Sequence, residues 1–376
     1  MSKNKTGNRE QRIITDLLRL AGIAINGTNP WDIIVHDNRV YPALLHEGSL
    51  GLGESYMAGW WDCEQPDQLI ARLIKADLEN QVKTSVKFQI RMLLSKIINF
   101  QNRRRALEVG KVHYDIDPNL YRCMLDSEMN YSCGYWKNAS TLEEAQRAKL
   151  ELSCLKLKLE PGMKVLDIGC GFGAFAKHAA KYHKVKVVGI TISEQQATWA
   201  RKNCEGNSVE IRFQDYRDVA EHFDRIVSIG MFEHVGKKNY QEYMATVFRN
   251  LVDDGLFLLH TIGTNSKDGV DPWVTKYIFP NSALPMAQEI PNACAGHFVI
   301  EDWHNLGYDY VKTLSAWYKN FIRYWNSLGK THDERFYRMW TYYLSVFMGG
   351  FQARQLEVWQ VVLSKNHQVR DYVPVR

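Results

Sequence analysis

The sequence predicts an α/β protein with a mostly parallel sheet and a small, mainly helical N-terminal domain. From residue 163 onward, apolar runs that suit buried strands alternate with helical patterns, as in sheets whose parallel strands are joined by helices. The first part of the chain lacks this alternation and shows helical spacing instead, as at Ile13, Leu17 and Leu20. A chain of 376 residues also suits one large domain with a smaller one.

Changes in composition set the expected domain boundaries. Residues 1–80 form the N-terminal domain, 81–105 form a charged linker helix that ends in three arginines, and 106–376 form the main domain. Within the first domain, the stretch 47–56 contains three glycines and is interpreted as a turn-rich loop. The arginines of the linker suit either a solvated helix end or a phosphate contact, and the solvated end is favoured.

In the main domain, Thr141 and Glu144 have the spacing of a capping box, so a helix is expected to begin there. Its apolar face includes Leu155, and Pro161 and Gly162 end it. Further helices are expected at 173–183, 194–203, 238–251, 309–326 and 332–350. Strands are expected at 163–168, 185–190, 208–213, 225–230 and 255–261, with closing strands at 297–303 and 356–363.

Composition limits the kinds of partner. The chain has 47 basic and 42 acidic residues, a net charge of +5, which is too small an excess to predict nucleic-acid binding and suits an anionic membrane surface. The seven cysteines form no C-x-x-C pair, so reduced thiols, no metal site and a cytoplasmic location are expected. The first residues lack the apolar core of a signal peptide, and no apolar run reaches the roughly 18 residues of a membrane span. Membrane contact is therefore expected to be peripheral.

The most informative motif is a glycine-rich turn between the first strand and its helix. It places Asp167 at the strand end and Gly169, Gly171 and Gly173 at alternate positions after it. Glycines in such a turn let a ligand approach the backbone closely. The spacing D-x-G-x-G-x-G differs from the G-x-G-x-x-G of dinucleotide sites and resembles motif I of class I S-adenosylmethionine (SAM) methyltransferases. An ordinary tight turn in an α/β domain is the alternative.

Polar residues at the next two strand ends extend this candidate cofactor site. Thr191, Ile192 and Gln196 follow the second strand, where hydroxyl and amide groups replace the acidic residue of a dinucleotide site. Asp215 and Tyr216 follow the third strand and offer an acceptor and an aromatic face that suit an adenine. Since the carboxyl ends of parallel strands meet at one edge of a sheet, these residues are expected to share a pocket.

A carboxylate and an imidazole follow the fourth and fifth strands. Glu233 lies just beyond the fourth strand, and His260 lies at the end of the fifth. Either residue alone is more often structural. Neighbouring strand ends are expected to bring the two into one cleft, where they position or move a proton.

Together these motifs resemble the cyclopropane-fatty-acyl-phospholipid synthase family of SAM-dependent enzymes, over nearly all of the chain. The resemblance implies a class I SAM-dependent methyltransferase fold, Rossmann-like with a mostly parallel sheet, in which 106–376 is the catalytic domain with lipid-binding insertions. It rests on the stretch 47–56, His113-Tyr114-Asp115, Tyr131-Ser132-Cys133, the glycine turn, Phe232-Glu233-His234 and Leu259-His260-Thr261-Ile262.

The family's reaction transfers a methylene from SAM to the cis double bond of an unsaturated phospholipid acyl chain. The resemblance implies a carbocation that bound bicarbonate deprotonates, giving a cyclopropane fatty acyl phospholipid and S-adenosylhomocysteine. It also implies a homodimer that works on acyl chains in an anionic membrane, at its inner, cytoplasmic face. The alternatives are a sister enzyme that leaves a methyl branch, a headgroup N-methyltransferase, and a lipid- or SAM-binding protein without catalysis.

The resemblance also assigns residues to roles. The implied bicarbonate ligands are Cys133, Glu233, His260, the backbone of Ile262, and Tyr318. Cys133 is then a contact of the anion and not a nucleophile. The residues implied to bind SAM are Tyr131, Ser132, Asp167, Gly169, Gly171, Gly173, Thr191, Ile192, Gln196, Asp215 and Tyr216.

The chain departs from many relatives at two aromatic positions. Phe172 stands where many have tryptophan, and Phe347 stands where several have cysteine, which excludes covalent cysteine chemistry there. For membrane contact, the candidates are Trp60, Trp61 and the irregular segment 263–296, which is also expected to form a lid. Core packing is the favoured explanation of the two tryptophans.

Overall fold

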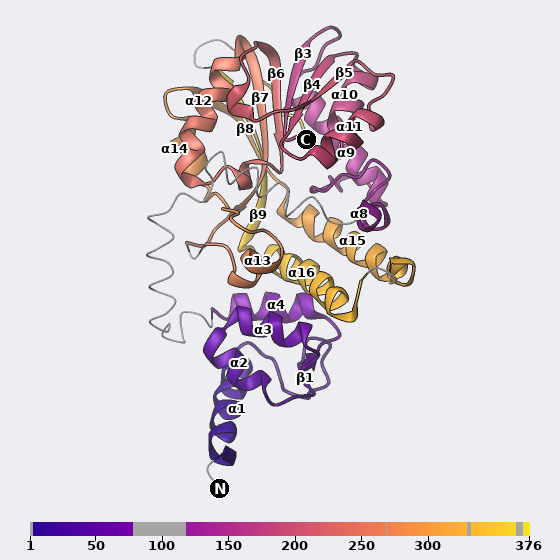
Figure 1. Cartoon of the computed structure of the whole chain (residues 1–376). Coiled ribbons are helices and arrows are strands. Elements are labelled where there is room, and N and C mark those ends of the chain that lie inside the picture. The colour runs from indigo at the N-terminus through magenta and orange to yellow at the C-terminus, as the bar shows by residue number, and fades with distance from the viewer. Residues whose placement is uncertain (1–2, 78–117, 268, 329–331, 366–370) are drawn as a thin grey trace. The chain divides into compact units, whose positions relative to one another are not determined.

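The computed structural model describes residues 3–77, 118–267, 269–328, 332–365 and 371–376 (Figure 1). The predicted linker helix 81–105 and the motif His113-Tyr114-Asp115 lie outside the described residues.

Contacts group the chain into two compact units, and the domain boundaries expected from the sequence stay a prediction. The first unit comprises Met1–Asn99, Val270–Pro280 and Leu314–Leu356, and the second comprises Phe100–Gly269, Asn281–Thr313 and Glu357–Arg376.

The second unit is built on a seven-stranded sheet with the strand order β5-β4-β3-β6-β7-β9-β8. Its strands from β3 to β7 pair in parallel, and β8 pairs with β9 in antiparallel register. The central strand β3 pairs with both β4 and β6, so the direction of connection reverses there, and ligands bind at the carboxyl ends of strands at such a reversal. The strands are β3 (Lys164–Ile168), β4 (Lys186–Thr191), β5 (Val209–Phe213), β6 (Phe223–Ile229), β7 (Leu251–Thr264), β8 (Phe298–Asn305) and β9 (Leu356–Lys365).

Helices cover both faces of this sheet (Figure 1). Successive side chains point to opposite faces, so that Val165 packs with α9, α10 and α11, and Leu166 packs with α12 and α14. The near-continuous apolar strands predicted this two-sided burial, and the expected strands and helices are confirmed. The helices are α8 (Pro118–Met124), α9 (Leu142–Lys156), α10 (Ala174–His183), α11 (Glu194–Asn203), α12 (Tyr240–Asn250) and α14 (Glu289–Cys294), with short 3-10 turns η1 (Tyr216–Asp218), η2 (Phe232–His234) and η3 (Lys237–Asn239).

The capping box at the start of α9 is confirmed. The hydroxyl oxygen of Thr141 accepts from the backbone N–H of Glu144 at 3.2 Å, and the carboxylate of Glu144 accepts from the backbone N–H of Thr141 at 3.1 Å. These two bonds satisfy donors that the first turn of a helix leaves unpaired. The start of α9 is thereby set by its own sequence.

The first unit is mainly helical, and α16 packs on α3 and α4 within it. The side chain of Gln352 donates to Asp67 at 2.9 Å and accepts from Gln68 at 3.1 Å, which ties α16 to α4. The range of α15 (Gly307–Leu328) is divided between the two units after Thr313. The other elements are α1 (Lys3–Leu20), β1 (Ile34–Val35), α2 (Val40–Glu47), α3 (Ser49–Met57), β2 (Trp61–Asp62), α4 (Pro66–Lys75), α13 (Pro272–Tyr277) and α16 (Glu334–Gln352).

The expectation of a turn-rich loop at 47–56 was wrong, because these residues end α2 and form α3. A single residue, Gly48, separates the two helices, and its φ of 57° ends the first of them. Gly53 serves close packing instead: a Cβ there would lie 2.4 Å from the Trp273 ring. In a sequence, a glycine that is needed for a turn cannot be distinguished from a glycine that allows close packing on a helix.

Trp61 is a core residue and not a membrane contact. It is completely buried, and its indole N–H donates to the carbonyl of Leu52 at 3.2 Å. Trp60 is partly buried, with the guanidinium of Arg39 4.5 Å from its ring. Core packing therefore explains Trp61, as the sequence favoured.

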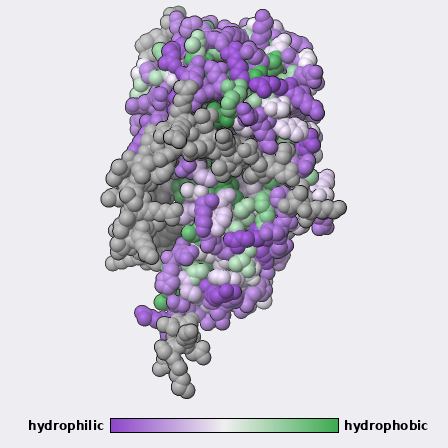
Figure 2. Space-filling view, in the orientation of Figure 1, coloured by the Kyte–Doolittle hydropathy of each residue, from purple (hydrophilic) through white to green (hydrophobic). Residues whose placement is uncertain are grey.

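The surface seen in Figure 2 is mainly hydrophilic, with apolar residues in small scattered groups. No helix in the described ranges combines the length and apolarity needed to cross a membrane. The segment 263–296, expected to be irregular, contains the two short helices α13 and α14.

Candidate active site

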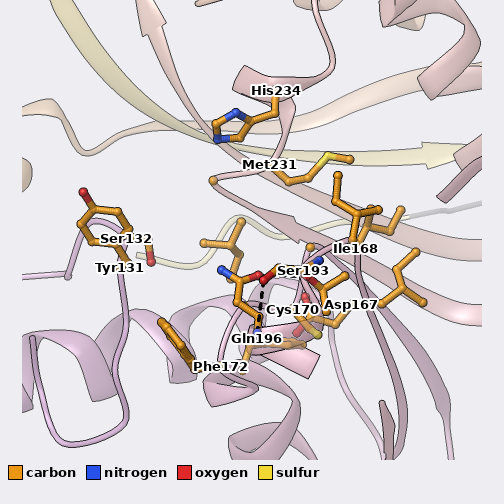
Figure 3. Close-up of a pocket in the computed structure, with 18 of the residues that line it drawn as sticks. Tyr131, Ser132, Asp167, Ile168, Cys170, Phe172, Ser193, Gln196, Met231 and His234 are labelled. Atoms are coloured by element: carbon orange, nitrogen blue, oxygen red, sulfur yellow. Dashed lines mark hydrogen bonds between the residues drawn. The ribbon is translucent and has the colours of Figure 1, made fainter. Parts of the chain in front are cut away.

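A pocket opens at the carboxyl ends of β3, β4, β5 and β6, where the strand order predicts a ligand site (Figure 3). Tyr131 and Ser132 lie on one side of it, opposite Asp167 and Cys170 of the glycine turn. Gly173 does not line the pocket but is the N-cap of α10. The other residues that the sequence assigned to SAM all line it, namely Tyr131, Ser132, Asp167, Gly169, Gly171, Thr191, Ile192, Gln196, Asp215 and Tyr216.

The three glycines of the turn have left-handed φ angles of 79°, 54° and 84°, and they serve different purposes. A Cβ on Gly171 would meet no atom within 4 Å, so this position faces open space. On Gly169 a Cβ would lie 2.8 Å from Met231, and on Gly173 it would lie 2.7 Å from the sulfur of Cys204. Gly171 therefore allows a ligand close to the backbone, whereas Gly169 and Gly173 allow the protein to pack on itself.

Beyond β4, hydrogen bonds hold the side chain of Gln196 at the pocket wall. The hydroxyl of Thr191 donates to Gln196 Oε1 at 2.9 Å, which turns the amide nitrogen away from Thr191. The hydroxyl oxygen of Ser193 accepts from the backbone N–H of Gln196 at 3.2 Å and caps α11 (Figure 3). The start of α11 thus positions polar groups for a ligand.

Beyond β5, Asp215 is held by an arginine that the sequence did not reveal. Arg217 donates to the Asp215 carboxylate from Nε at 2.9 Å and from Nη2 at 2.8 Å. The backbone N–H of Arg217 also donates to Oδ1, at 3.0 Å, so three hydrogen bonds fix the carboxylate at the pocket wall. The ring of Tyr216 packs on Tyr243, with centroids 5.0 Å apart, and is mostly buried.

A buried lysine, also missed by the sequence, lines the pocket together with Asp167. Lys149 of α9 is 1% exposed, and its Nζ donates to Asn130 at 2.9 Å and to the Ser132 hydroxyl at 3.0 Å. Burial lowers the pKa of Lys149 to about 8, against the opposing effect of Asp126. Burial also raises the pKa of Asp167 to about 7, and Lys149 limits that rise.

Glu233 lies in the segment after β6 that contributes Met231, His234 and Val235 to the pocket wall. Its Oε1 accepts from the backbone N–H of Ile262 at 2.7 Å, while its Oε2 is buried without a hydrogen-bond partner among the described residues. Burial raises the pKa of this carboxyl to about 7. This bond places Glu233 beside β7, and the expectation that Glu233 and His260 share one cleft stays a prediction.

His260 is 2% exposed, and burial lowers the pKa of its imidazole to about 3. The thiol of Cys133 is completely buried, and its pKa is raised well above the ordinary value. It points to the carbonyl oxygens of Gly134 and Leu306, 3.2 and 3.7 Å from the sulfur. Tyr318 is a half-buried residue of the first unit, so its place beside these groups stays a prediction.

Three potential metal ligands meet between α9 and α10. The ligand atoms of Cys154, His178 and His183 lie within 4.8 Å of one another. Both imidazoles already bond through Nε2 to one carboxylate oxygen of Glu151, at 3.0 and 3.1 Å. These hydrogen bonds account for both histidines without a metal ion.

Comparisons with known proteins identify relatives of the whole chain. Residues 101–361 match the family model described as mycolic acid cyclopropane synthetase. The cyclopropane-fatty-acyl-phospholipid synthase of Escherichia coli (strain K12) is 52% identical over 355 residues, which cover 94% of this chain and 93% of the relative.

Solved structures match the fold as well. The cyclopropane synthase MmaA2 from Mycobacterium tuberculosis has a TM-score of 0.66 and 30% identity, covering 71% of this chain and 100% of that one. The mycolic acid cyclopropane synthase CmaA1, complexed with SAH and CTAB, has a TM-score of 0.65 and 30% identity, covering 69% and 98%. The fold is that of class I SAM-dependent methyltransferases with an added helical N-terminal region.

Proposed function

We propose that this chain, which belongs to the mycolic acid cyclopropane synthetase family, uses SAM to convert the cis double bond of a phospholipid acyl chain into a cyclopropane ring. Near-full-length similarity to a cyclopropane-fatty-acyl-phospholipid synthase supports the reaction. The residue roles rest on Glu233, which lies in the segment that also forms the pocket wall and whose buried Oε2 has no hydrogen-bond partner in the described ranges.

The pocket at the strand ends is the proposed SAM site. SAM, when bound, supplies an electrophilic methyl group. Gly171 gives the ligand access to the backbone, and Asp215 with Tyr216 would recognise adenine through an acceptor and a ring face. Thr191 and Gln196 offer polar groups nearby. The remaining pocket residues assigned to this site are Tyr131, Ser132, Asp167, Gly169 and Ile192, and Gly173 serves beside it as the N-cap of α10.

Cys133, Glu233, His260, Ile262 and Tyr318 are the proposed bicarbonate site. Glu233 suits a small anion as a ligand. Because the pKa of its carboxyl is about 7, the carboxyl is protonated in a large fraction of molecules near neutral pH, and the protonated form can donate a hydrogen bond from Oε2. Bicarbonate, when bound there, would supply the base for the proton lost from the new methyl group. The N–H of Ile262 serves by orienting Glu233.

The buried residues of the proposed bicarbonate site would contribute to the reaction by excluding water. An alkene is a weak nucleophile, so the protein must position it against the methyl donor. The cation formed on the acyl chain is quenched by water, so the site must be dry. Glu233, His260 and Cys133 are each less than about a tenth exposed, as such a site requires.

Docking of a homodimer on an anionic membrane at the cytoplasmic face completes the proposal. The net charge of +5 and the phospholipid-modifying relative support it. Flotation with anionic and with zwitterionic vesicles tests the docking, and sedimentation velocity tests the dimer. Absence of flotation with anionic vesicles would contradict membrane docking, and a purely monomeric species would contradict the homodimer.

Mass spectrometry of acyl chains tests the reaction. Purified protein is incubated with SAM, bicarbonate and vesicles of cis-unsaturated phospholipid. A gain of one methylene with loss of the double bond is expected, and omission of bicarbonate should lower the rate. A saturated methyl branch or a methylated headgroup would replace the reaction, and SAM binding without transfer would indicate a protein that has lost catalysis.

A further inference from the structure

A chain of hydrogen bonds connects helix α9 to His260 through Gln360 of β9. All the side chains involved are buried, with Ser153 and Gln360 at 0% exposure. Gln360 Nε2 lies 3.3 Å from His260 Nδ1 and 3.3 Å from the hydroxyl oxygen of Ser153. Ser153 Oγ in turn donates to the backbone carbonyl of Lys149 at 2.8 Å.

The direction of each bond follows from the hydrogens available. A serine hydroxyl carries one hydrogen, and Ser153 uses it on the carbonyl of Lys149, which only accepts. Ser153 must therefore accept from Gln360, so the amide nitrogen and not the amide oxygen faces Ser153 and His260. His260 Nδ1 then accepts as well, and the ring proton of the neutral imidazole resides on Nε2.

Burial, aided by nearby basic residues, keeps the imidazole of His260 neutral. Burial is the main cause of its lowered pKa. Lys149 and Lys156 of α9 and His304 of β8 act in the same direction, since each disfavours a further positive charge. A neutral ring with its proton on Nε2 donates a hydrogen bond without surrendering the proton to a bound base.

We propose that Gln360 is a positioning residue that holds His260 in the Nε2–H tautomer, so that a neutral donor is offered to the anion. This inference rests on the proposed function, in which that anion is bicarbonate. The Oε1 of Gln360 is buried without a hydrogen-bond partner in the described part of the chain. Leaving an amide oxygen buried without a partner costs stability. Such an arrangement is expected where the amide nitrogen must donate to the imidazole in order to fix its tautomer.

Gln360→Glu tests the proposal because it keeps the shape and removes the donor. The spectra are recorded above the pKa of the buried carboxyl, because an ionised carboxylate only accepts, and His260 should then move its proton to Nδ1 or become doubly protonated. Long-range proton–nitrogen correlation spectra of the full-length protein, labelled at histidine nitrogens, report the tautomer. His260→Asn identifies the signal by its loss. The wild type should carry the proton on Nε2.

Gln146→Leu is the matched control for the tautomer. Gln146 is another buried amide close to the proposed site, but it donates to the carbonyl of Ser132 at 2.8 Å. Its removal should leave the tautomer of His260 unchanged. In Gln360→Glu, kcat should fall roughly 10- to 100-fold, the usual effect of losing a residue that orients a ligand, while the Kd for SAM changes little.

A wild-type His260 protonated on Nδ1, or an unchanged tautomer in Gln360→Glu, would overturn the proposal. If Gln360→Glu does not fold, Gln360→Met replaces it and should show a mixture of tautomers. Should the wild type make no cyclopropane lipid, the proposed function fails by itself. The tautomers of wild type and variants would still decide whether Gln360 controls His260.

Discussion

Replacing Glu233 by glutamine is expected to stabilise the protein while removing most of its turnover. Burial raises the pKa of this carboxyl from 4.5 to about 7. The unfolded chain therefore loses the proton near pH 4.5 and the folded chain near pH 7, so the free energy of unfolding falls between these values. At about 1.4 kcal/mol per pH unit, the loss reaches about 3 kcal/mol above pH 7.

Glutamine avoids this loss because it has no charge to desolvate. Its oxygen can still accept from the N–H of Ile262, but its amide nitrogen takes the place of the unpaired Oε2 of Glu233. A buried unpaired donor costs about 1 kcal/mol or more. The net gain of Glu233→Gln is therefore about 2 kcal/mol at pH 8, and it should vanish near pH 5, below which the variant is slightly the less stable protein.

Urea unfolding of the two proteins at pH 5 and pH 8 measures this difference. Glu221→Gln is the control with the opposite sign, since hydrogen bonds from Arg212 and Lys164 lower the pKa of Glu221 to about 2. Its stabilisation is present above pH 4.5 and is lost as the pH falls toward 2, so the control variant should be less stable than wild type at pH 8.

The same Glu233→Gln protein should bind SAM normally in calorimetry and lose most methylene transfer. A variant no more stable than wild type at pH 8 would refute the argument from burial. Full activity would remove Glu233 from the catalytic residues.

The other predictions concern the pocket. Gly171→Ala should weaken SAM binding at least tenfold in calorimetry with a loss of only about 1 kcal/mol of stability, because its Cβ enters open space at a left-handed φ. Gly173→Ala should cost more in urea unfolding, about 2–4 kcal/mol, because its Cβ also meets Cys204. Equal stabilities of the two variants would contradict this. Lys149→Met should destabilise by about 3 kcal/mol and weaken SAM binding, since Asp167 loses its facing cation; unchanged SAM affinity would count against it.

Much of the second unit could be predicted because its signals are local. The ends of three strands were visible in the sequence as changes from apolar to polar residues, at Asp167, Thr191 and Asp215. Parallel pairing brings such strand ends together at one edge of the sheet. The expectation that Glu233 and His260 share a cleft used the same reasoning and stays a prediction. These predictions needed only the order of the strands.

Helix α9 shows where the sequence is insufficient. Its expected apolar face included Leu155, which is 45% exposed, whereas the next residue, Lys156, is completely buried. Four polar residues, Gln146, Lys149, Ser153 and Lys156, form a buried stripe at helical spacing. A polar stripe normally predicts a solvated face, and only the tertiary partners Ser132, Gln360 and Asp302 show that it faces inward. These partners are 17 to 207 residues away in the chain.

One physical cause, the removal of water, accounts for the electrostatics of the site. Burial raises the pKa of Asp167 and Glu233 and lowers the pKa of Lys149 and His260, so each group moves toward its neutral form. The inward polar stripe of α9 bonds to Ser132 and to Gln360, which in turn bonds to His260, where solvent would otherwise do so. In the proposed reaction, a site with few full charges of its own and little water would leave the charge of the bound anion unscreened beside the cation on the acyl chain. The stability that Glu233 forfeits above pH 7 is on this view a consequence of the dryness that the reaction requires.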